Sequence, residues 1–383
     1  MLPFSNPDPK ACLVTRIWRP GLGPALVTLR GDTVVDITSR EAPTLRDLLE
    51  RDDAADYVTH AGGEEVISLA DLNDASTETA SPDSLRFLAP PDLQAIKASG
   101  VTFAESMVER VIEEQAAGDA DRADEIRQKV QGVIGNSLSG IEPGSAKAME
   151  VKRVLQAEGL WSAYLEVGIG PDAEVFTKCQ PMASVGWGAS VGLHPISTWN
   201  NPEPEIVLAI NSRGQIKGAT LGNDVNLRDV EGRSALLLGK AKDNNASCAI
   251  GPFLRLFDGD YGMAQVESAE LTLKVTGEDG FVLNGHSSMK KISRRPADIV
   301  AQTIGRHHQY PDGFFLFLGT LFAPIQDRDA PGQGFTHKMG DVVSISEPGL
   351  GELRNTVRLS TEAPEWSFGT GQLMRNLSAR GLL

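Results

Sequence analysis

The sequence has few of the features that mark secreted or membrane-spanning proteins. Only three of the 383 residues are cysteines, Cys12, Cys179 and Cys248, and they lack the spacing of a metal site. This cysteine usage favours the cytoplasm. The first residues do not combine a basic head with an apolar run, so we expect no signal peptide. No apolar stretch approaches the length of a membrane span.

Positive charge is also scarce. There are 36 Lys and Arg residues against 51 Asp and Glu residues, which gives a formal net charge of −15. Such a balance argues against binding to nucleic acid or to anionic membrane surfaces. If this acidic protein binds an anionic small molecule, it must concentrate positive charge locally, at a metal ion or at a few Lys and Arg side chains.

The length of the chain predicts two domains with enough residues for a sizeable core. Residues 11–90 have the pattern of a small β-rich unit with a hairpin and a short helix. The later part of this unit, up to about residue 84, is expected to be loop. Because Pro90-Pro91 marks a boundary, we predict a small N-terminal α+β domain over residues 1–92 and a catalytic domain over residues 93–383.

The larger region begins with helices and continues with strands. Apolar residues recur at helical spacing from Phe103 to about Gly132, and a further helix is expected near residues 145–158. These segments (about residues 103–158) are candidates for a lid over a site, although their apolar stripe is also typical of ordinary core packing. Strands are expected at 164–167, 174–178, 205–211, 216–221, 270–276, 314–319, 342–346 and 352–359. This pattern favours an α+β, mainly β fold, a sheet roll or sandwich, over a doubly wound parallel sheet.

A candidate metal site stands where two of these strands form a hairpin. Glu203 and Glu205 begin the strand that ends near Ile210, and alternation along a strand points both side chains to one face. Asp224 lies just past the returning strand and can close on the same point. Three converging carboxylates repel one another unless a cation neutralises them, and oxygen-only ligation suits Mg²⁺, Mn²⁺ or Ca²⁺ better than Zn²⁺. The residues alone leave a solvated strand edge open, and Pro204 suits such an edge.

Several motifs follow one another in a fixed order between about residues 95 and 357. They are Glu203-Pro-Glu205, Gly222-Asn-Asp-Val-Asn-Leu-Arg-Asp229, Ala241-Lys242 before Ala246-Ser-Cys248, Leu318-Gly-Thr320, Gly340-Asp-Val-Val-Ser-Ile345 and Gly349-Leu-Gly-Glu-Leu-Arg-Asn355. Together they resemble the fumarylacetoacetate hydrolase superfamily. The resemblance implies that family's mixed β-sandwich roll, a divalent metal ion held by the three carboxylates, and a homodimer or homotetramer.

The resemblance also implies roles for residues beside the metal. Lys242 occupies the position of the family's active-site lysine, where an ammonium group can stabilise an enolate; without the resemblance it would be a surface lysine. Arg228 matches an arginine of the family motif and would bind substrate, or it is a structural ion-pair partner of Asp229. Thr320 matches the threonine that contacts the oxo-acid end of the substrate. Glu231 stands where many members carry a substrate-binding glutamine, and it can accept hydrogen bonds from a polyol.

One segment departs from the family's hydrolases. These enzymes typically carry Asn-Tyr-x-x-His-x-x-Glu, with the His and Glu as a catalytic dyad. In this chain Ser106 stands at the His position, while Glu109 keeps the Glu position. Serine cannot act as a general base near neutral pH, which disfavours attack by an activated water. We therefore expect Glu109 and Glu105 to be the acid/base groups and Ser106 to contact substrate.

The motifs indicate one branch of the family. The stretches that begin at Gly222 and at Ala241, with His308-Gln-Tyr-Pro-Asp-Gly313, resemble 2-keto-3-deoxy-pentonate dehydratases of non-phosphorylated D-xylose and D-arabinose catabolism. The resemblance implies a Mg²⁺-dependent hydro-lyase that converts a small 2-oxo sugar acid to 2,5-dioxopentanoate. An acylpyruvate-type C–C hydrolase or an oxaloacetate decarboxylase on the same scaffold is the nearest alternative. A non-catalytic, metal-binding oligomeric protein is an alternative of another class.

Overall fold

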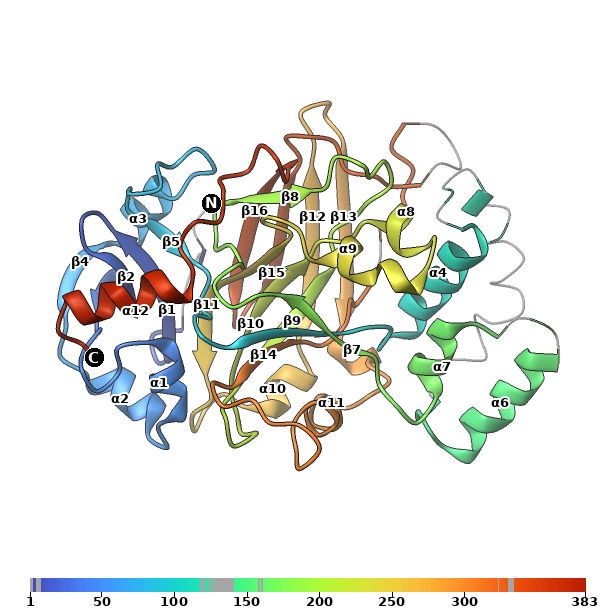
Figure 1. Ribbon diagram of the computed structural model, residues 1–383, viewed down its shortest axis with the longest axis horizontal. Helices are drawn as coiled ribbons and strands as arrows, with labels where there is room; N and C mark the ends of the chain where they lie inside the picture. Colours follow the sequence, from blue (N-terminus) through green and yellow to red (C-terminus); the bar gives the residue numbers. More distant parts are fainter. Residues whose placement is uncertain are drawn as a thin grey trace.

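The computed structural model describes residues 3–4, 8–117, 119, 122–123, 126, 141–157, 159, 161–322, 324–329 and 334–383. Strands dominate the centre of the molecule, and helices lie at its two ends and along one side (Figure 1). None of the helices in this part of the chain is both long and apolar enough to cross a membrane.

Eleven strands of the described residues form one continuous sheet. Their order is β4 (Glu64–Ser68), β3 (Thr33–Asp36), β2 (Gly23–Arg30), β1 (Leu13–Arg19), β11 (Cys248–Leu256), β10 (Ile216–Asp224), β9 (Pro204–Ile210), β14 (Phe314–Phe317), β6 (Ala95–Ser99) and β7 (Val175–Cys179), with β5 (Arg86–Leu88) paired to β1. The central strands β9, β11 and β14 are buried along their whole length. Their near-continuous apolar sequences are typical of strands covered on both faces.

A second sheet packs against the middle of the first one. Its order is β13 (Val282–Ser288), β12 (Glu270–Thr276), β15 (Val342–Glu347), β16 (Gly351–Leu359) and β8 (Ser190–Leu193). In β12 buried and exposed residues alternate, so that Leu271, Leu273 and Val275 join one core with Ile206 and Leu208 of β9. The expectation of an α+β, mainly β sandwich roll is therefore confirmed.

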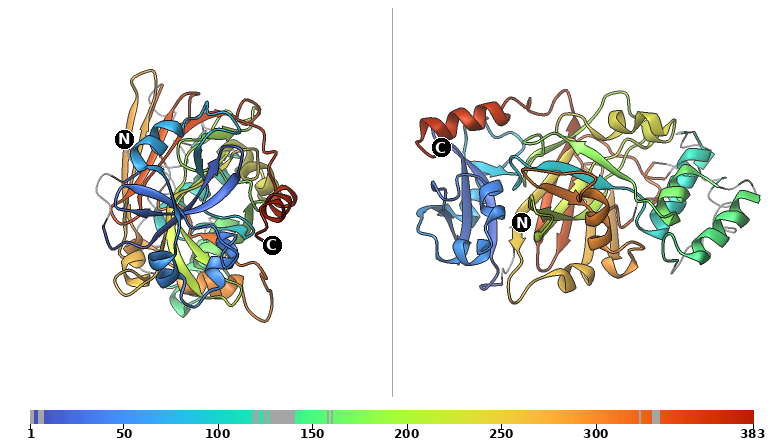
Figure 2. Two further views of the ribbon diagram at one scale, coloured as in Figure 1. Left: turned by 90° about the vertical axis from the view of Figure 1, so that its left-hand side faces the viewer. Right: turned by 60° about the horizontal axis from the view of Figure 1, so that its bottom comes forward.

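The helices of the described residues are short in most cases. They are α1 (Leu45–Glu50), α2 (Ala54–His60), α3 (Leu69–Ala75), α4 (Ala104–Gln115), α6 (Ala146–Ala157), α7 (Ala163–Ile169), α8 (Arg228–Glu231), α9 (Leu238–Lys242), α10 (Met263–Glu267), α11 (Pro296–Thr303) and α12 (Thr370–Ala379), with 3₁₀ turns η1 (Ala235–Leu237) and η2 (Met289–Lys291). The helices α4, α6 and α7 lie at the end of the molecule opposite the N-terminal unit (Figure 2).

The N-terminal unit shares its sheet with the rest of the chain, because β1 pairs antiparallel with β11. Arg16 is buried at the junction, where Nε donates to the carbonyl oxygens of Ala89 and Pro90 and Nη2 donates to that of Pro91. The C-terminal helix α12 packs across the same unit (Figure 1). A domain boundary at residue 92 stays a prediction.

Two local expectations were wrong. The stretch that ends near residue 84 is not all loop, because it contains α2, β4 and α3, and Ser68 caps α3 by accepting a hydrogen bond from Asp71 N. Residues 164–167 are helical in α7, where Ser162 caps the start and accepts from Leu165 N. Buried residues fall on one side of this short helix, and a run so short does not distinguish a helix from a strand by its apolar pattern.

Candidate active site

The hairpin of β9 and β10 brings the three predicted carboxylates together. Glu203 immediately precedes β9, Glu205 is the second residue of that strand, and Asp224 is the last residue of β10. The amide of Asp224 donates to the carbonyl oxygen of Glu203 at 3.0 Å, which fixes the register at this end. One oxygen from each carboxylate lies within 4.8 Å of the other two, and all three residues are buried.

The alternative of a solvated strand edge does not hold. The strand β9 lies between β10 and β14, and every residue from Pro204 to Ile210 is buried. Buried carboxylates need compensating charge or hydrogen bonds. The donor set is all oxygen, and its spacing fits a hard divalent cation such as Mg²⁺, Mn²⁺ or Ca²⁺. Glu203, Glu205 and Asp224 are therefore the residues that could hold a metal ion.

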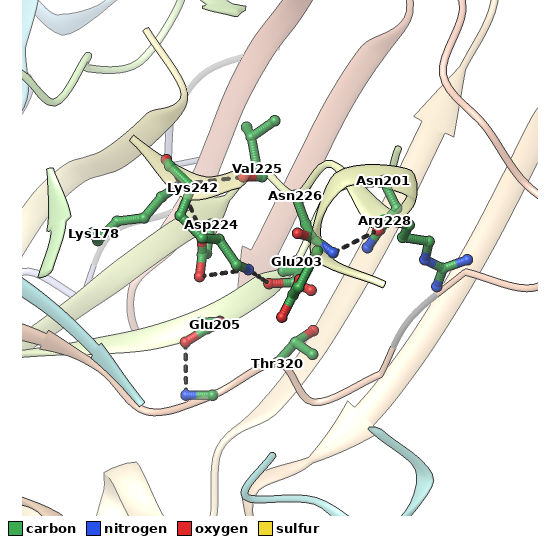
Figure 3. Close-up of polar contacts among 12 residues, drawn as sticks. Lys178, Asn201, Glu203, Glu205, Asp224, Val225, Asn226, Arg228, Lys242 and Thr320 are labelled. Atoms are coloured by element: carbon green, nitrogen blue, oxygen red, sulfur yellow. Dashed lines mark hydrogen bonds and ion pairs between the residues drawn. The ribbon is translucent and has the colours of Figure 1, made fainter. Parts of the chain in front are cut away.

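Two buried lysines face this cluster (Figure 3). Lys242, at the end of α9, places Nζ 2.5 Å from Glu203 Oε2 and 3.1 Å from Asp224 Oδ2. Lys178 on β7 lies behind Asp224, with Nζ 2.8 Å from its Oδ1. The sequence-based alternative of a surface position for Lys242 is wrong, because this side chain is almost fully buried. Sequence analysis missed Lys178, whose signal is only a single lysine within a short β-prone run.

The three carboxylates do not share one electrostatic environment. Burial raises the pKa of Glu205 well above its usual range, and repulsion from Asp224 and Glu203 adds to this effect. Burial alone would also raise the pKa of Asp224, but the ammonium groups of Lys178 and Lys242 outweigh it and hold that pKa below its usual value. The carboxylates of Asp224 and Glu203 raise the pKa of Lys242 against the effect of its burial. The site therefore keeps Lys242 charged, and Glu205 holds a proton more readily than Asp224 does.

Glu205 and Thr320 are connected through the loop after β14. The amide of Gly319 donates to Glu205 Oε2 at 2.7 Å. Gly319 has a φ of +95°, and a Cβ at this position would lie 2.1 Å from Thr102 Oγ1, so that only glycine fits. Thr320 Oγ1 donates to the carbonyl oxygen of Phe322 at 2.9 Å. This loop presents Thr320 to the same cavity as the carboxylates.

A small cavity opens at the carboxylate cluster. It is lined by Ser99, Gly100, Val101, Arg110, Glu174, Phe176, Glu203, Glu205, Asp224, Glu231, Lys242 and Thr320. Six of the ten residues that the sequence predicted for the site thus share one cavity. Arg110 and Glu174 are additions that sequence analysis missed.

Glu174 comes directly before β7 and is half-buried at the cavity. Burial, with repulsion from Glu231, raises the pKa of Glu174 to about 7, although Arg110 and Lys242 oppose this shift. A carboxyl that titrates near neutral pH is suited to take up and release protons during a reaction. Nothing in the sequence around Ala173-Glu-Val distinguishes this glutamate from an ordinary strand-end residue.

The other predicted residues lie elsewhere. Arg228 is buried to one side of the carboxylates, and its guanidinium points away from them (Figure 3). Its Nε lies 3.0 Å from Glu113 Oε1. The carboxylate of Asp229 accepts hydrogen bonds from Ser197 and Thr198 instead. Glu109 is buried on α4 and is not among the described residues that line the cavity. Glu105 and Ser106 belong to the first turn of α4, and their side chains lie outside the described part of the chain.

Comparison with known proteins agrees with this geometry. Residues 175–358 match the family model described as fumarylacetoacetate (FAA) hydrolase C-terminal. Over these residues the chain is similar to that family. The carboxylates, Lys242 and Thr320 come from the hairpin of β9 and β10, from α9 and from the loop after β14, and all of these lie within the matched residues. The family resemblance noted in the sequence is thus confirmed.

Two curated relatives of the chain are named dehydratases. The chain is 30% identical over 185 residues to 2-dehydro-3-deoxy-D-arabinonate dehydratase of Saccharolobus solfataricus, which covers 48% of this chain and 58% of that protein. It is 33% identical over 196 residues to a probable 2-keto-3-deoxyxylonate dehydratase of Haloferax volcanii, which covers 51% of this chain and 63% of that protein. The aligned regions thus span less than two thirds of either relative.

A solved structure shares the fold over most of the chain. It is named 2-keto-3-deoxy-D-arabinonate dehydratase complexed with magnesium and 2,5-dioxopentanoate. The TM-score is 0.61 at 21% sequence identity, with 91% of this chain and 99% of that chain covered. The fold of the matched residues 175–358, together with that of the unit that precedes them, is therefore shared.

Proposed function

We propose that the protein is a divalent-metal-dependent hydro-lyase that dehydrates a 2-keto-3-deoxy-pentonate to 2,5-dioxopentanoate. The observation that carries the proposal is one cavity that joins an all-oxygen carboxylate cluster to a buried, charged lysine and a carboxyl with a pKa of about 7. The names of the curated relatives support this substrate class. Magnesium is the metal named for the structural neighbour, and Glu203, Glu205 and Asp224 are the residues that would hold it here.

The reaction needs removal of a proton from C3 and loss of the hydroxide from C4. A bound divalent cation would polarise the 2-keto group and acidify the C3 protons. We assign removal of that proton to the carboxylate of Glu174, because it lines the cavity and titrates near neutrality. The roles of Glu109 and Glu105 as acid/base groups remain predictions from the sequence. Migration of a proton from C5 to C3 and ketonisation then give the aldehyde, so that the net loss is one water.

Lys242 and Thr320 would orient the substrate during this reaction. The ammonium group of Lys242 is held at the cavity by Glu203 and Asp224, where it can stabilise negative charge that develops on an enolate oxygen. Thr320 lines the cavity, and its hydroxyl would have to turn from the carbonyl oxygen of Phe322 to donate to the carboxylate end of the substrate. Glu231 lines the cavity as a hydrogen-bond acceptor for a substrate hydroxyl. Ser106 remains a predicted substrate contact, whereas Arg228 pairs with Glu113 and is not among the described residues that line the cavity.

The cavity is poorly equipped for the hydrolase alternative. None of the described residues that line it is a histidine, so no imidazole is placed there to activate a water. A carbon acid beside a metal-bound keto group needs only a carboxylate base. The contents of the cavity therefore favour dehydration over C–C cleavage.

One sample of pure protein with Mg²⁺ tests the proposal on both substrate classes. We expect 2-keto-3-deoxy-D-xylonate or its C4 epimer to yield 2,5-dioxopentanoate, detected as a semialdehyde, with little cleavage of acylpyruvates or decarboxylation of oxaloacetate. Efficient acylpyruvate cleavage without semialdehyde would assign the protein to the hydrolase branch. If Mg²⁺ raises the melting temperature while no 2-oxo acid turns over, the protein is a non-catalytic metal binder.

A further inference from the structure

Arg110 joins the helix α4 to the metal-ligand cluster. Its guanidinium contacts Glu203 Oε1 through Nη2. The other oxygen of this carboxylate, Oε2, is taken by Lys242. Both oxygens of Glu203 are therefore already engaged by cationic side chains, one from α4 and one from α9. Arg110 comes from far outside the hairpin that carries the three carboxylates.

The guanidinium has further carboxylate partners. Arg110 Nη1 lies 2.6 Å from Glu113 Oε2 and 3.0 Å from Glu231 Oε2. All of these side chains are almost fully buried. Because Glu113 and Glu231 are not members of the three-carboxylate cluster, Arg110 can leave Glu203 and remain paired. This arrangement lowers the cost of giving up one contact, since a buried charge without a partner would be strongly unfavourable.

A divalent cation at the cluster and the guanidinium of Arg110 require the same carboxylate. Two cations that bind Glu203 from opposite sides would repel each other strongly in a buried environment. We propose that Arg110 is an internal competitor of the metal ion for Glu203, and that occupation of the site by metal releases α4 from this contact. The inference rests on the metal site of the proposed function and not on the reaction itself.

Arg110 could compete with the metal ion for Glu203, or it could support metal binding by positioning Glu203. The two roles predict opposite effects of an Arg110 variant on metal affinity. If Arg110 competes, its removal leaves Glu203 with more negative potential and strengthens metal binding. If Arg110 instead positions Glu203 for the metal, its removal weakens metal binding. The coupling between the two is reciprocal. If bound metal weakens the contact of Arg110 with Glu203 by a given free energy, that contact weakens metal binding by the same free energy.

Calorimetry measures Mn²⁺ binding to the 383-residue chain without substrate and distinguishes competition from support. We expect Arg110→Gln to lower the Kd for Mn²⁺ about fivefold or more, the lower end of typical couplings between sites, and Arg110→Lys to give a smaller change. Arg228→Gln is the matched control, because it removes the same charge from the same network but Arg228 pairs with Glu113 and with none of the three metal carboxylates. An unchanged or raised Kd in Arg110→Gln overturns the proposal, as does equal tightening in Arg228→Gln.

The wild-type chain provides a second measurement in case Arg110→Gln does not fold. Hydrogen exchange of the α4 amides from Met107 to Gln115 should become faster when Mn²⁺ is added, while exchange in β11 should not. Slower or unchanged exchange in α4 at saturating Mn²⁺ contradicts the proposal. If the wild type binds no Mn²⁺ at all, the metal site itself is wrong, which is a separate result.

Discussion

The ammonium group of Lys242 lies 2.5 Å from Glu203 Oε2, and this contact ties the last residue of α9 to the start of β9. Lys240, one half-turn earlier in the same short helix, is exposed to solvent. The two lysines therefore differ in environment although they stand two residues apart, and they form a natural pair of test and control positions.

We expect Lys242→Ala to lower kcat by about a hundredfold or more, as loss of a preorganised charge-stabilising group commonly does. If Lys242 acts mainly on the enolate, KM should change little. Lys240→Ala should leave both constants within about twofold. Steady-state kinetics with the keto acid measure both variants, and equal losses would show that Lys242 has no special role.

The three carboxylates should be individually required for metal-dependent turnover. Glu203→Gln, Glu205→Gln and Asp224→Asn each remove one charged oxygen ligand from a cluster of three, and we expect each to abolish activity. EDTA should have the same effect on the wild type, reversibly with Mg²⁺ or Mn²⁺. Glu65→Gln, at an exposed position of β4, is the control. Full activity of EDTA-treated protein would remove the metal from the mechanism.

The pKa of Glu174 predicts a pH profile. Because the carboxylate form is the base and its pKa is about 7, kcat/KM should rise with pH up to about 7 and level off above it. Glu174→Gln should lose most of the activity, and its remaining kcat/KM should no longer rise with pH up to about 7. Glu109→Gln should keep the rise of kcat/KM with pH. If the rise is instead lost in Glu109→Gln and kept in Glu174→Gln, Glu109 is the base.

The same shift has a consequence for stability. The pKa of Glu174 is raised from its usual value of 4.5, so the folded chain binds the proton more tightly than the unfolded chain. Its contribution to stability is complete below pH 4.5 and is lost as pH rises through about 7. Urea unfolding of the wild type and of Glu174→Gln at pH 5 and pH 8 measures this effect. The free energy of unfolding should fall less between pH 5 and pH 8 in the variant than in the wild type.

The continuous sheet predicts that the N-terminal unit and the β roll unfold together. Phe253 on β11 is fully buried and packs against Phe87 of the N-terminal unit, with ring centroids 5.8 Å apart. Phe253→Ala should lower the free energy of unfolding by about 3–5 kcal/mol in a single transition. Val282→Ala, at a half-exposed position of β13, should change it by less than about 0.5 kcal/mol. Two separate transitions in the wild type would instead support a domain boundary at residue 92.

The sequence by itself determined the β-rich character of the chain and the core of the site. Alternation along a strand placed Glu203 and Glu205 on one side, and the short hairpin returned Asp224 to them. These are local consequences of strand geometry and a tight turn. Together with the family motifs they also identified Lys242, Glu231 and Thr320 at the same cavity.

Only the tertiary structure decided which charges meet from distant segments. Arg110 on α4, Glu174 before β7 and Lys178 within β7 reach the carboxylates because two sheets and a helix pack around them, and no local pattern marks these residues. The helical state of α7 was also decided by capping and packing, since its apolar run is too short to fix a period. Burial then set the pKa values, because desolvation and the nearest charges depend on the three-dimensional arrangement and not on the order of residues.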